Sequence, residues 1–300
     1  MRLVSLIGEQ PIPNLLPVRS LKPNETLLVY TQRTEAVARR LRKLISNIDD
    51  LSGDLRVEPY DMAKTVQNLQ KRLHSFDDVV FNLTGGTKIM SLAAFTLALQ
   101  YRRPFIYLES ERKRSSLRQY EFENGAIVSK PPEEIKTVIN IDDYLRAHLP
   151  GYRLEGYHSD KNGQLDAGGY FEKAVHHALQ SRLDEVVAGI RPEGVEEQIE
   201  IDLAVRIGNQ VGIIELKTGG EDAGKRALDQ LKMAAEPTYL GTYTKQFLIT
   251  ASTKLKGRND LLAQKRNITV IHLPNYQHGR SLSKDDAERL AKEIRLALSG

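Results

Sequence analysis

The chain has 300 residues, of which 40% are hydrophobic and 27% are charged, and it contains no cysteine. This composition supplies apolar surface for about two domains with cores of their own, and it excludes disulfides and thiolate zinc sites. No segment reaches the roughly 18 apolar residues of a membrane span, and the first residues lack a signal peptide's apolar stretch. We therefore expect a cytoplasmic protein without a membrane partner, whose net charge of +4 is compatible with a polyanionic ligand.

The first part of the chain alternates short apolar runs with amphipathic segments, which is typical of a mainly parallel sheet covered by helices. Strands are expected at 3–7, 26–30, 55–57, 79–83 and 105–108, and helices at 35–48, 62–73 and 88–99. A last strand at 117–122 is expected to form an edge hairpin, and the basic segment 111–118 is interpreted as a solvated turn. The pattern predicts an α/β domain.

A glycine-rich turn, Thr84-Gly85-Gly86-Thr87-Lys88, stands where the fourth expected strand passes into a helix. Glycines let a ligand approach the backbone, and a helix N-terminus favours an anion. The turn lacks the spacing of a Walker A motif, so ATP hydrolysis is not implied. Because ligands of open α/β sheets gather beyond the carboxyl ends of the strands, we expect segments 8–14 and 31–34 to join this turn at one rim. The alternative is a structural turn with a threonine cap.

Two prolines, at positions 131 and 132, mark the expected end of this first domain. Residues 135–168 are interpreted as a connector that holds a strand-like pair at 138–139, a short helix from residue 142 and a loop at 151–168. A helix at 169–179 follows, and Glu172 borders its apolar stripe.

Two alternating segments around Gly208-Asn209 predict a β-hairpin with a two-residue turn. That turn length places every apolar side chain on one face, whereas a three-residue turn would mix the faces. The expected pairs are Ile201–Leu216, Asp202–Glu215, Leu203–Ile214, Ile207–Gln210 and Glu200–Lys217.

Two carboxylates that face each other across a strand pair repel, at about 5 Å between their Cβ atoms. A divalent cation held by Asp202 and Glu215 would relieve this repulsion, and hard oxygen ligands suit Mg²⁺ or Mn²⁺. Lys217 follows on the same face, where its ammonium could orient a water that attacks a phosphodiester. The alternative is the solvated face of an ordinary hairpin.

This arrangement resembles the PD-(D/E)XK nucleases, although Ile201 stands where their motif has proline. The resemblance implies that Glu172 adds an acidic metal ligand and that Gln230, on a helix expected at 223–235, matches a glutamine of many members. Further strands are expected at 245–250 and 268–273, with a last helix at 285–298. Among the histidines considered as metal ligands, His158, His176 and His177, the adjacent pair is more typical of surface or packing positions.

The order of the two parts, with a Thr-Gly-Gly-Thr-Lys turn before the hairpin, resembles the effectors that join a CRISPR-associated Rossmann-fold (CARF) domain to a PD-(D/E)XK nuclease in type III CRISPR defence. The expected fold is an N-terminal Rossmann-like CARF domain at 1–134, a connector at 135–168 and a restriction-endonuclease-like α/β domain at 169–300. The resemblance implies a homodimer that binds a cyclic oligoadenylate, the tetramer, across its two-fold axis. The implied pocket residues are Gln10, Ile12, Asn14, Thr31, Thr84, Gly85, Gly86, Thr87 and Lys88.

The expected function is therefore that of a nuclease that requires a metal ion and is activated by a cyclic oligoadenylate. Single-stranded DNA, RNA and nicked duplex all fit the chemistry of Asp202, Glu215 and Lys217. One alternative is a restriction-type nuclease that needs no small ligand. Another is a nucleotide-sensing regulator without catalysis.

Overall fold

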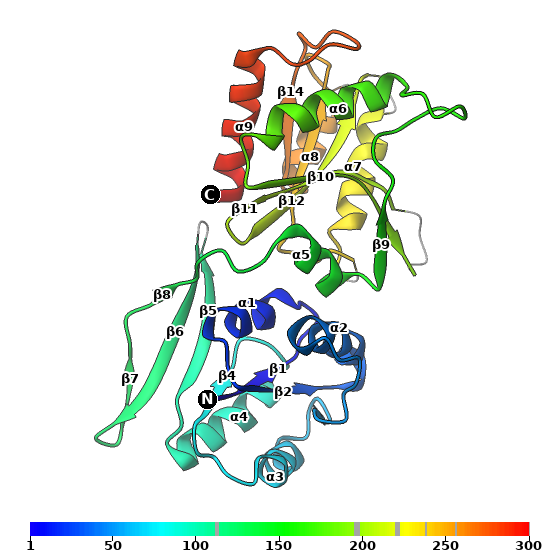
Figure 1. The fold of residues 1–300 in the computed structure, drawn as a ribbon. Helices are drawn as coiled ribbons and strands as arrows, with labels where there is room; N and C mark the ends of the chain where they lie inside the picture. The colour runs from blue at the N-terminus through cyan, green and yellow to red at the C-terminus, as the bar shows by residue number, and fades with distance from the viewer. Residues whose placement is uncertain (112–113, 195–198, 220–222, 238, 256, 300) are drawn as a thin grey trace. The chain divides into compact units, whose positions relative to one another are not determined.

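The computed structural model describes residues 1–111, 114–194, 199–219, 223–237, 239–255 and 257–299, and it comprises two compact units (Figure 1). The units are Met1–Ile139 and Asn140–Gly300. The expected connector at 135–168 is divided between them, because its residues from 140 onward belong to the second unit. In the described part of the chain, no helix has both the length and the apolar character that crossing a membrane requires.

The first unit is built on one sheet, with the strand order β3-β2-β1-β4-β5-β6-β7 and β8 paired to β6. The pairs from β3 to β5 are parallel, whereas β6 pairs antiparallel with its neighbours. The strands are β1 (Arg2–Leu6), β2 (Glu25–Tyr30), β3 (Leu55–Arg56), β4 (Val79–Asn82), β5 (Phe105–Glu111), β6 (Arg114–Glu123), β7 (Ala126–Ser129) and β8 (Glu133–Glu134). The helices are α1 (Ile12–Leu21), α2 (Glu35–Ser46), α3 (Met62–Leu73) and α4 (Lys88–Tyr101), with a 3-10 turn at Gln32–Thr34.

Helices cover both faces of this sheet. One pair, α1 and α2, packs on β1 and β2, and the other pair, α3 and α4, lies on the opposite face (Figure 1). The core under α3 and α4 joins apolar side chains of alternate strand positions, such as Leu6 and Val29, to those of the helices, such as Leu69 and Leu97. Strands buried between two helical layers explain the continuous apolar runs of the sequence.

Helix α1 was not expected from the sequence. Residues 8–14 are predicted to form a rim loop, but the helix begins at Ile12. Pro11 and Pro13 obscure the helical pattern in the sequence. Proline nevertheless fits the first turn of a helix, because the backbone N–H that it lacks would have no partner within the helix there. As a result Ile12 and Asn14 are 6% and 0% exposed, respectively.

The strand expected at 117–122 is present and forms a hairpin, but its predicted place at the edge of the sheet was wrong. That segment lies in β6, which pairs with β5 on one side and with β7 and β8 on the other. Arg114 and Arg118, assigned to a solvated turn, are already in this strand, while positions 112 and 113 lie outside the described residues. The strand-like pair expected at 138–139 is not a strand.

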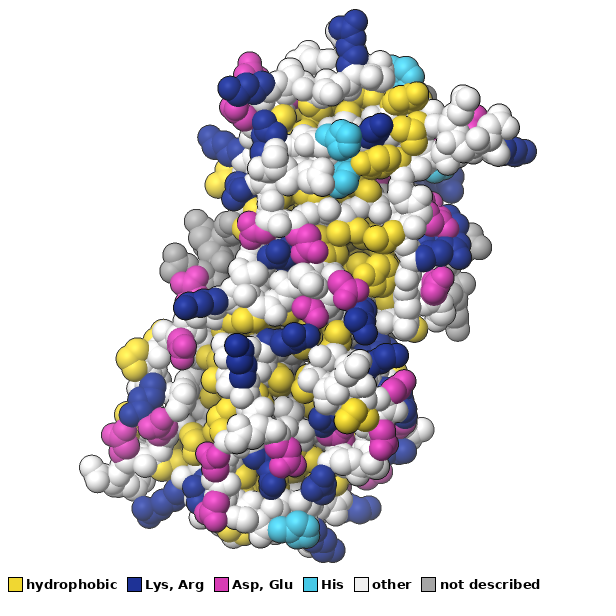
Figure 2. Space-filling model, viewed as in Figure 1, with side chains coloured by type: hydrophobic (Ala, Val, Ile, Leu, Met, Phe, Trp, Pro, Cys, Tyr) yellow, Lys and Arg dark blue, Asp and Glu magenta, His cyan; other side chains and the backbone are white. Residues whose placement is uncertain are grey.

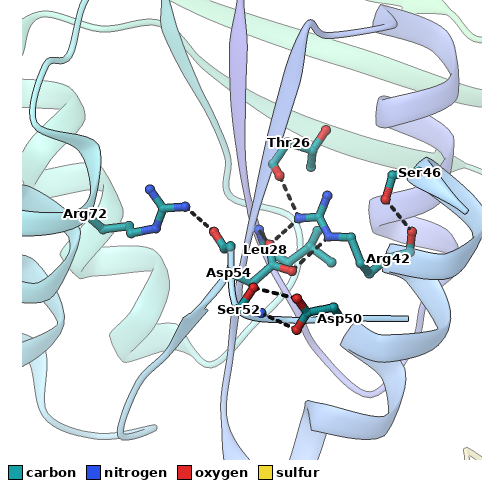
Figure 3. A network of polar contacts seen from close by, with 9 residues as sticks. Thr26, Leu28, Arg42, Ser46, Asp50, Ser52, Asp54 and Arg72 are labelled. Atoms are coloured by element: carbon teal, nitrogen blue, oxygen red, sulfur yellow. Dashed lines mark hydrogen bonds and ion pairs between the residues drawn. The ribbon is translucent and has the colours of Figure 1, made fainter. Parts of the chain in front are cut away.

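A buried ion pair closes the loop before β3 (Figure 3). Arg42 of α2 donates from Nε to Asp54 Oδ2 at 2.9 Å and from Nη2 to the Thr26 carbonyl at 2.7 Å. The backbone N–H of Leu28 donates to Asp54 Oδ1 at 2.8 Å. The Asp54 side chain is 0% exposed, so these donors replace its lost hydration and tie α2, β2 and the loop together.

We expect Asp54→Asn to lower the free energy of unfolding by about 3 kcal/mol, because the buried Arg42 guanidinium then loses its counter-charge. Urea denaturation of the full chain measures the change. Asp50→Asn is the control, since Asp50 lies exposed on the same loop and should shift the free energy by less than about 0.5 kcal/mol. Equal effects of the two substitutions would contradict this role of Asp54.

The second unit is a six-stranded mixed sheet with the order β14-β13-β12-β11-β10-β9. Helices α6 and α9 pack together over β11 and β12, whereas α7 contacts β12, β13 and α8. The strands are β9 (Gly151–Leu154), β10 (Glu185–Glu193), β11 (Ile201–Ile207), β12 (Gln210–Lys217), β13 (Lys245–Thr250) and β14 (Ile268–His272). The helices are α5 (Ile141–His148), α6 (Ala167–Gln180), α7 (Ala223–Ala234), α8 (Asn259–Lys265) and α9 (Lys284–Ser299).

Three elements of this unit were missed. The expected loop at 151–168 contains β9, and neither β10 nor α8 was predicted. Strand β10 contains Gly189 and Pro192, which both depress strand propensity, and it is stabilised by pairing with β9 and β11.

The β11–β12 hairpin has the expected register. Its described pairs run from Leu203–Ile214 to Ile207–Gln210, as a two-residue turn at Gly208 and Asn209 requires. The apolar face is buried against α6 and α9, with Leu203, Val205 and Ile214 at 0% exposure. The alternate positions, on the other face, carry the charged residues near the end of the hairpin.

Candidate ligand site and candidate metal centre

Three loops of the first unit meet at the carboxyl ends of β1, β2 and β4. A Cβ built at Gly8, after β1, would stand 3.3 Å from the backbone N of Gly86, after β4. Arg33, after β2, forms an ion pair with Glu9. The convergence expected from a parallel sheet is therefore present, because β2, β1 and β4 are neighbours.

The two threonine hydroxyls of the glycine-rich turn have structural partners. Thr84 Oγ1 donates to Asn82 Oδ1 at 2.6 Å and accepts from the backbone N of Leu108 at 2.8 Å. Thr87 caps α4 by accepting from Met90 N and donates to the Pro59 carbonyl at 2.7 Å. These bonds fix the turn, and exposed Lys88 follows at the first position of α4.

Gly85 packs tightly against the end of β1 and against Asn14 of α1. A Cβ at this position would stand 2.2 Å from the Leu6 carbonyl oxygen and 2.8 Å from Asn14 Nδ2. Asn14 lies under the turn, where its Oδ1 accepts from Asn82 Nδ2 at 3.4 Å. Within the described structure, Asn14 Nδ2 and Gln10 Oε1 are buried without a hydrogen-bond partner, which is costly unless a ligand or a movement supplies one.

The other predicted pocket residues lie around this turn at different depths. Thr31 is 5% exposed, its backbone N donates to Thr34 Oγ1, and its hydroxyl lies 3.3 Å from the same oxygen, so both groups hold the start of the 3-10 turn. Ile12 and Asn14 are buried in α1, beneath the rim rather than on it. Contact of any of these residues with a ligand stays a prediction.

In the second unit, Asp202, Glu215 and Lys217 lie together at the end of the hairpin. Glu215 is 3% exposed, and its Oε1 forms an ion pair with Lys217 Nζ at 2.6 Å. Asp202 Oδ2 accepts from the backbone N of Leu216 at 2.6 Å, which turns its carboxylate toward β12. Alternation along the strand places Glu215 and Lys217 on one face, and the hairpin register brings Asp202 to them.

Glu172 of α6 joins this group, although it is far from the hairpin in sequence. Its side chain is buried, and its Oε2 accepts from the backbone N of His158 at 2.8 Å. The charge of Asp202 is, after burial, the next cause that raises the pKa of Glu172. His158 in turn pairs through Nδ1 with Asp166 Oδ2 at 2.7 Å, and Asp166 caps α6.

Burial shifts the ionisation of all three acids. It raises the pKa of Glu172 to about 7, with a further contribution from the Asp202 carboxylate. Burial and then Asp202 raise the pKa of Glu215 to about 8, and burial raises that of Asp202 to about 6 against the opposing Lys217 ammonium. Burial lowers the pKa of Lys217, but the carboxylates of Glu215, Asp202 and Glu172 outweigh it and raise the value overall.

The chemistry of this group fits a hard divalent cation. In the described hydrogen bonds, one oxygen of each acid is engaged. Burial raises the pKa of all three acids, the Asp202 charge adds to the rise at Glu172 and Glu215, and a bound cation would favour their ionised forms. The Lys217 ammonium already supplies one positive charge beside the Glu215 carboxylate. Among the residues the structure describes, however, no three His, Asp or Glu side chains are already arranged as a ligand set.

Other candidates are placed apart from this group or serve structural roles. Gln230 is half-buried on α7, and no described bond links it to the acids. His176 Nδ1 bonds the Tyr157 hydroxyl at 2.5 Å. The sequence did not predict the hydrogen bond from the His158 backbone N to Glu172. The only signal of an ordered segment there is Asp166, an acidic residue at the position that caps a helix.

Comparison with known proteins identifies the first unit. Residues 2–144 match the family model of the Card1 CARF domain. The first unit is a CARF domain. A search of curated protein sequences finds no significant match.

Solved structures share the fold of this CARF domain and of the unit that follows it in sequence. Can2 from Sulfobacillus thermosulfidooxidans, in complex with cyclic tetra-adenylate, is 17% identical with a TM-score of 0.73, covering 100% of this chain and 99% of that one. Protein VC1899 from Vibrio cholerae is 14% identical with a TM-score of 0.76 and the same coverage. A type III CRISPR defence DNA nuclease activated by cyclic oligoadenylate is 16% identical with a TM-score of 0.65, covering 96% of this chain and 51% of that one.

These similarities confirm the predicted fold class. The chain pairs a CARF domain, with its mainly parallel Rossmann-like sheet, with a second α/β domain as in Can2. At these identities the likeness is one of fold. The activity must be argued from the residues of the two sites.

Proposed function

We propose that this protein is a cytoplasmic, metal-dependent endonuclease of type III CRISPR defence that is activated by a cyclic oligoadenylate. The observation that carries the proposal is the meeting of Glu172, Asp202 and Glu215 with Lys217 in a domain that follows a CARF domain. Two buried acids, Glu172 and Glu215, and the half-buried Asp202 together with one lysine destabilise a fold but suit phosphodiester hydrolysis.

The three acids would hold Mg²⁺ or Mn²⁺, which when bound stabilises charge on a phosphodiester and makes a water more acidic. Lys217, fixed by its bond to Glu215, donates its ammonium hydrogens toward the attacking water and the phosphate oxygens. The backbone contacts from Leu216 and His158 keep Asp202 and Glu172 in place. Each of these side chains is therefore positioned before the substrate arrives.

The CARF domain supplies the proposed activator site. Can2 was solved with cyclic tetra-adenylate, and the same ligand class suits the rim around the glycine-rich turn, where helix α4 begins and Lys88 adds a positive charge. A ring with two-fold symmetry suits a homodimer in which each copy offers the same loops. Activation requires that the ligand bind the cleaving arrangement more tightly than the resting one.

The substrate is a nucleic acid, DNA or RNA. On the face drawn in Figure 2, Lys and Arg side chains are interspersed with Asp and Glu on both units. Among the residues described on this face, the charges therefore form no broad positive surface.

The proposal is tested with circular single-stranded DNA, supercoiled plasmid and labelled RNA in Mn²⁺, with and without cyclic tetra-adenylate. We expect cleavage only with the ligand, and none by Glu215→Ala. Equal cleavage without the ligand would overturn activation and favour a restriction-type nuclease. Binding of the ligand without any cleavage would favour a regulator.

A further inference from the structure

A short segment before α6, residues 155–158, crosses both β10 and α6 at positions where only glycine fits. A Cβ at Gly189 of β10 would stand 1.8 Å from the Gly156 carbonyl oxygen, and one at Gly169 of α6 would stand 1.9 Å from the His158 carbonyl oxygen. Ordinary carbon–oxygen contacts are about 3.3 Å, so a methyl at either crossing would push the segment away by more than about 1 Å. We call residues 155–158 the strap.

The strap is held along its whole length. The backbone N of Glu155 donates to the Gly189 carbonyl at 2.8 Å, and the Tyr157 hydroxyl bonds His176 Nδ1 at 2.5 Å. His158 binds Asp166 at 2.7 Å through its side chain. The contact that matters for chemistry is the fourth, from the His158 backbone N to Glu172 Oε2 at 2.8 Å.

We propose that the strap positions Glu172 for metal binding and that Gly169 and Gly189 are the residues that make this possible. A glutamate on a helix has several rotamers, and the charge of a buried one is poorly solvated. The His158 N–H selects one rotamer and compensates part of that charge, which leaves Oε1 to face a cation. Glu172 is thus held by the His158 backbone N–H, which reaches it only because the strap lies so close to α6.

This inference rests on the proposed metal centre and goes beyond it, because it assigns a function to residues that touch neither metal nor substrate. Displacing the strap by about 1 Å breaks the His158–Glu172 bond, and the loss of such an outer contact typically weakens metal binding 10–100-fold. Glycines 168 and 169 are neighbours in one helix, so they offer a matched pair. A Cβ at Gly168 would meet only side-chain atoms, Asp166 Oδ1 at 3.3 Å and Glu172 Oε1 at 3.8 Å.

The test is calorimetric titration of Mn²⁺ into the full-length protein, without nucleic acid, for wild type, Gly169→Ala and Gly168→Ala. We expect Gly169→Ala to weaken Mn²⁺ binding at least about tenfold and Gly168→Ala to leave it within about twofold. Circular dichroism checks that each variant is folded. Equal affinity in Gly169→Ala and wild type overturns the strap alone, whereas no Mn²⁺ binding by the wild type overturns the metal centre and the strap with it.

A milder pair of variants decides the matter if Gly169→Ala does not fold. Tyr157→Phe removes the hydroxyl that anchors the strap to His176 and adds no atoms. Tyr152→Phe is its control, because that hydroxyl bonds Asp142 of α5 instead. We expect about threefold weaker Mn²⁺ binding for Tyr157→Phe and no change for Tyr152→Phe; unchanged affinity in both overturns the proposal.

Discussion

Glu215→Gln is expected to lower the rate of Mn²⁺-dependent cleavage by about 10³-fold or more, because the loss of one carboxylate ligand removes several kcal/mol of charge stabilisation. The amide keeps the shape of the side chain, so the hairpin stays intact. Gel-based cleavage at saturating cyclic tetra-adenylate measures the rate. Glu193→Gln, at an exposed end of β10, is the control and should cleave like the wild type.

The same substitution is expected to stabilise the metal-free protein at high pH. The pKa of Glu215 is raised to about 8, whereas an unfolded glutamate titrates near 4.3. Between these values the folded state keeps a proton that the unfolded chain has lost, so the free energy of unfolding falls as pH rises and the loss is complete above about pH 8. Glu215→Gln cannot ionise and escapes this loss.

Thermal unfolding without metal, measured at several pH values, tests whether the free energy of unfolding falls as the pH rises. Between about pH 6 and about pH 8 the wild type should lose stability, and Glu215→Gln should lose on the order of 2 kcal/mol less. Added Mn²⁺ should restore the wild type most strongly at high pH, since it binds the ionised acids. A wild type whose stability rises across this range would show that Glu215 is ionised at neutral pH without a metal, contrary to the raised pKa.

Gly85→Ala is expected to abolish activation, with at least about 100-fold weaker binding of cyclic tetra-adenylate. The added methyl would stand 2.2 Å from the Leu6 carbonyl oxygen, so the turn must move away from β1. Backbone donors displaced by 1 Å no longer meet the ligand, and several contacts are lost together. Calorimetry with the ligand measures this effect.

Two comparisons isolate the site of this effect. Gly53→Ala lies in the same CARF domain, where a Cβ would meet only the flexible end of Arg72 at 3.9 Å, and it should bind the ligand like the wild type. Binding of Mn²⁺ to the second domain should be equal in both variants. Normal ligand binding by Gly85→Ala would place the activator elsewhere than at the glycine-rich turn.

Local patterns account for most elements that the sequence predicted. Helix α3 and strand β13 have the predicted bounds, because apolar spacing and clear flanking residues define them. The hairpin of β11 and β12 was predictable in register, since a two-residue turn and one apolar face allow a single pairing. From that register the proximity of Asp202 and Glu215 followed.

Elements that depend on distant partners were not visible in the sequence. Strand β10 has weak propensity and is stabilised by β9 and β11, and α1 is obscured by prolines whose place in a first turn becomes clear only from the fold. The burial of Asn14 under Gly85 likewise depends on how α1 packs below β4. Propensity describes neighbours in sequence, while these features come from contacts across the sheet.

The sequence by itself determined the α/β class, the order of the two domains, the glycine-rich turn after β4 and the placing of three charged residues at one end of a hairpin. Each of these depends on periodicity or turn length over a few residues. Only the tertiary structure decided that the backbone of His158 reaches Glu172, and that glycines 169 and 189 let the strap through. Such close approaches depend on the positions of main-chain atoms from separate elements, which no local pattern specifies.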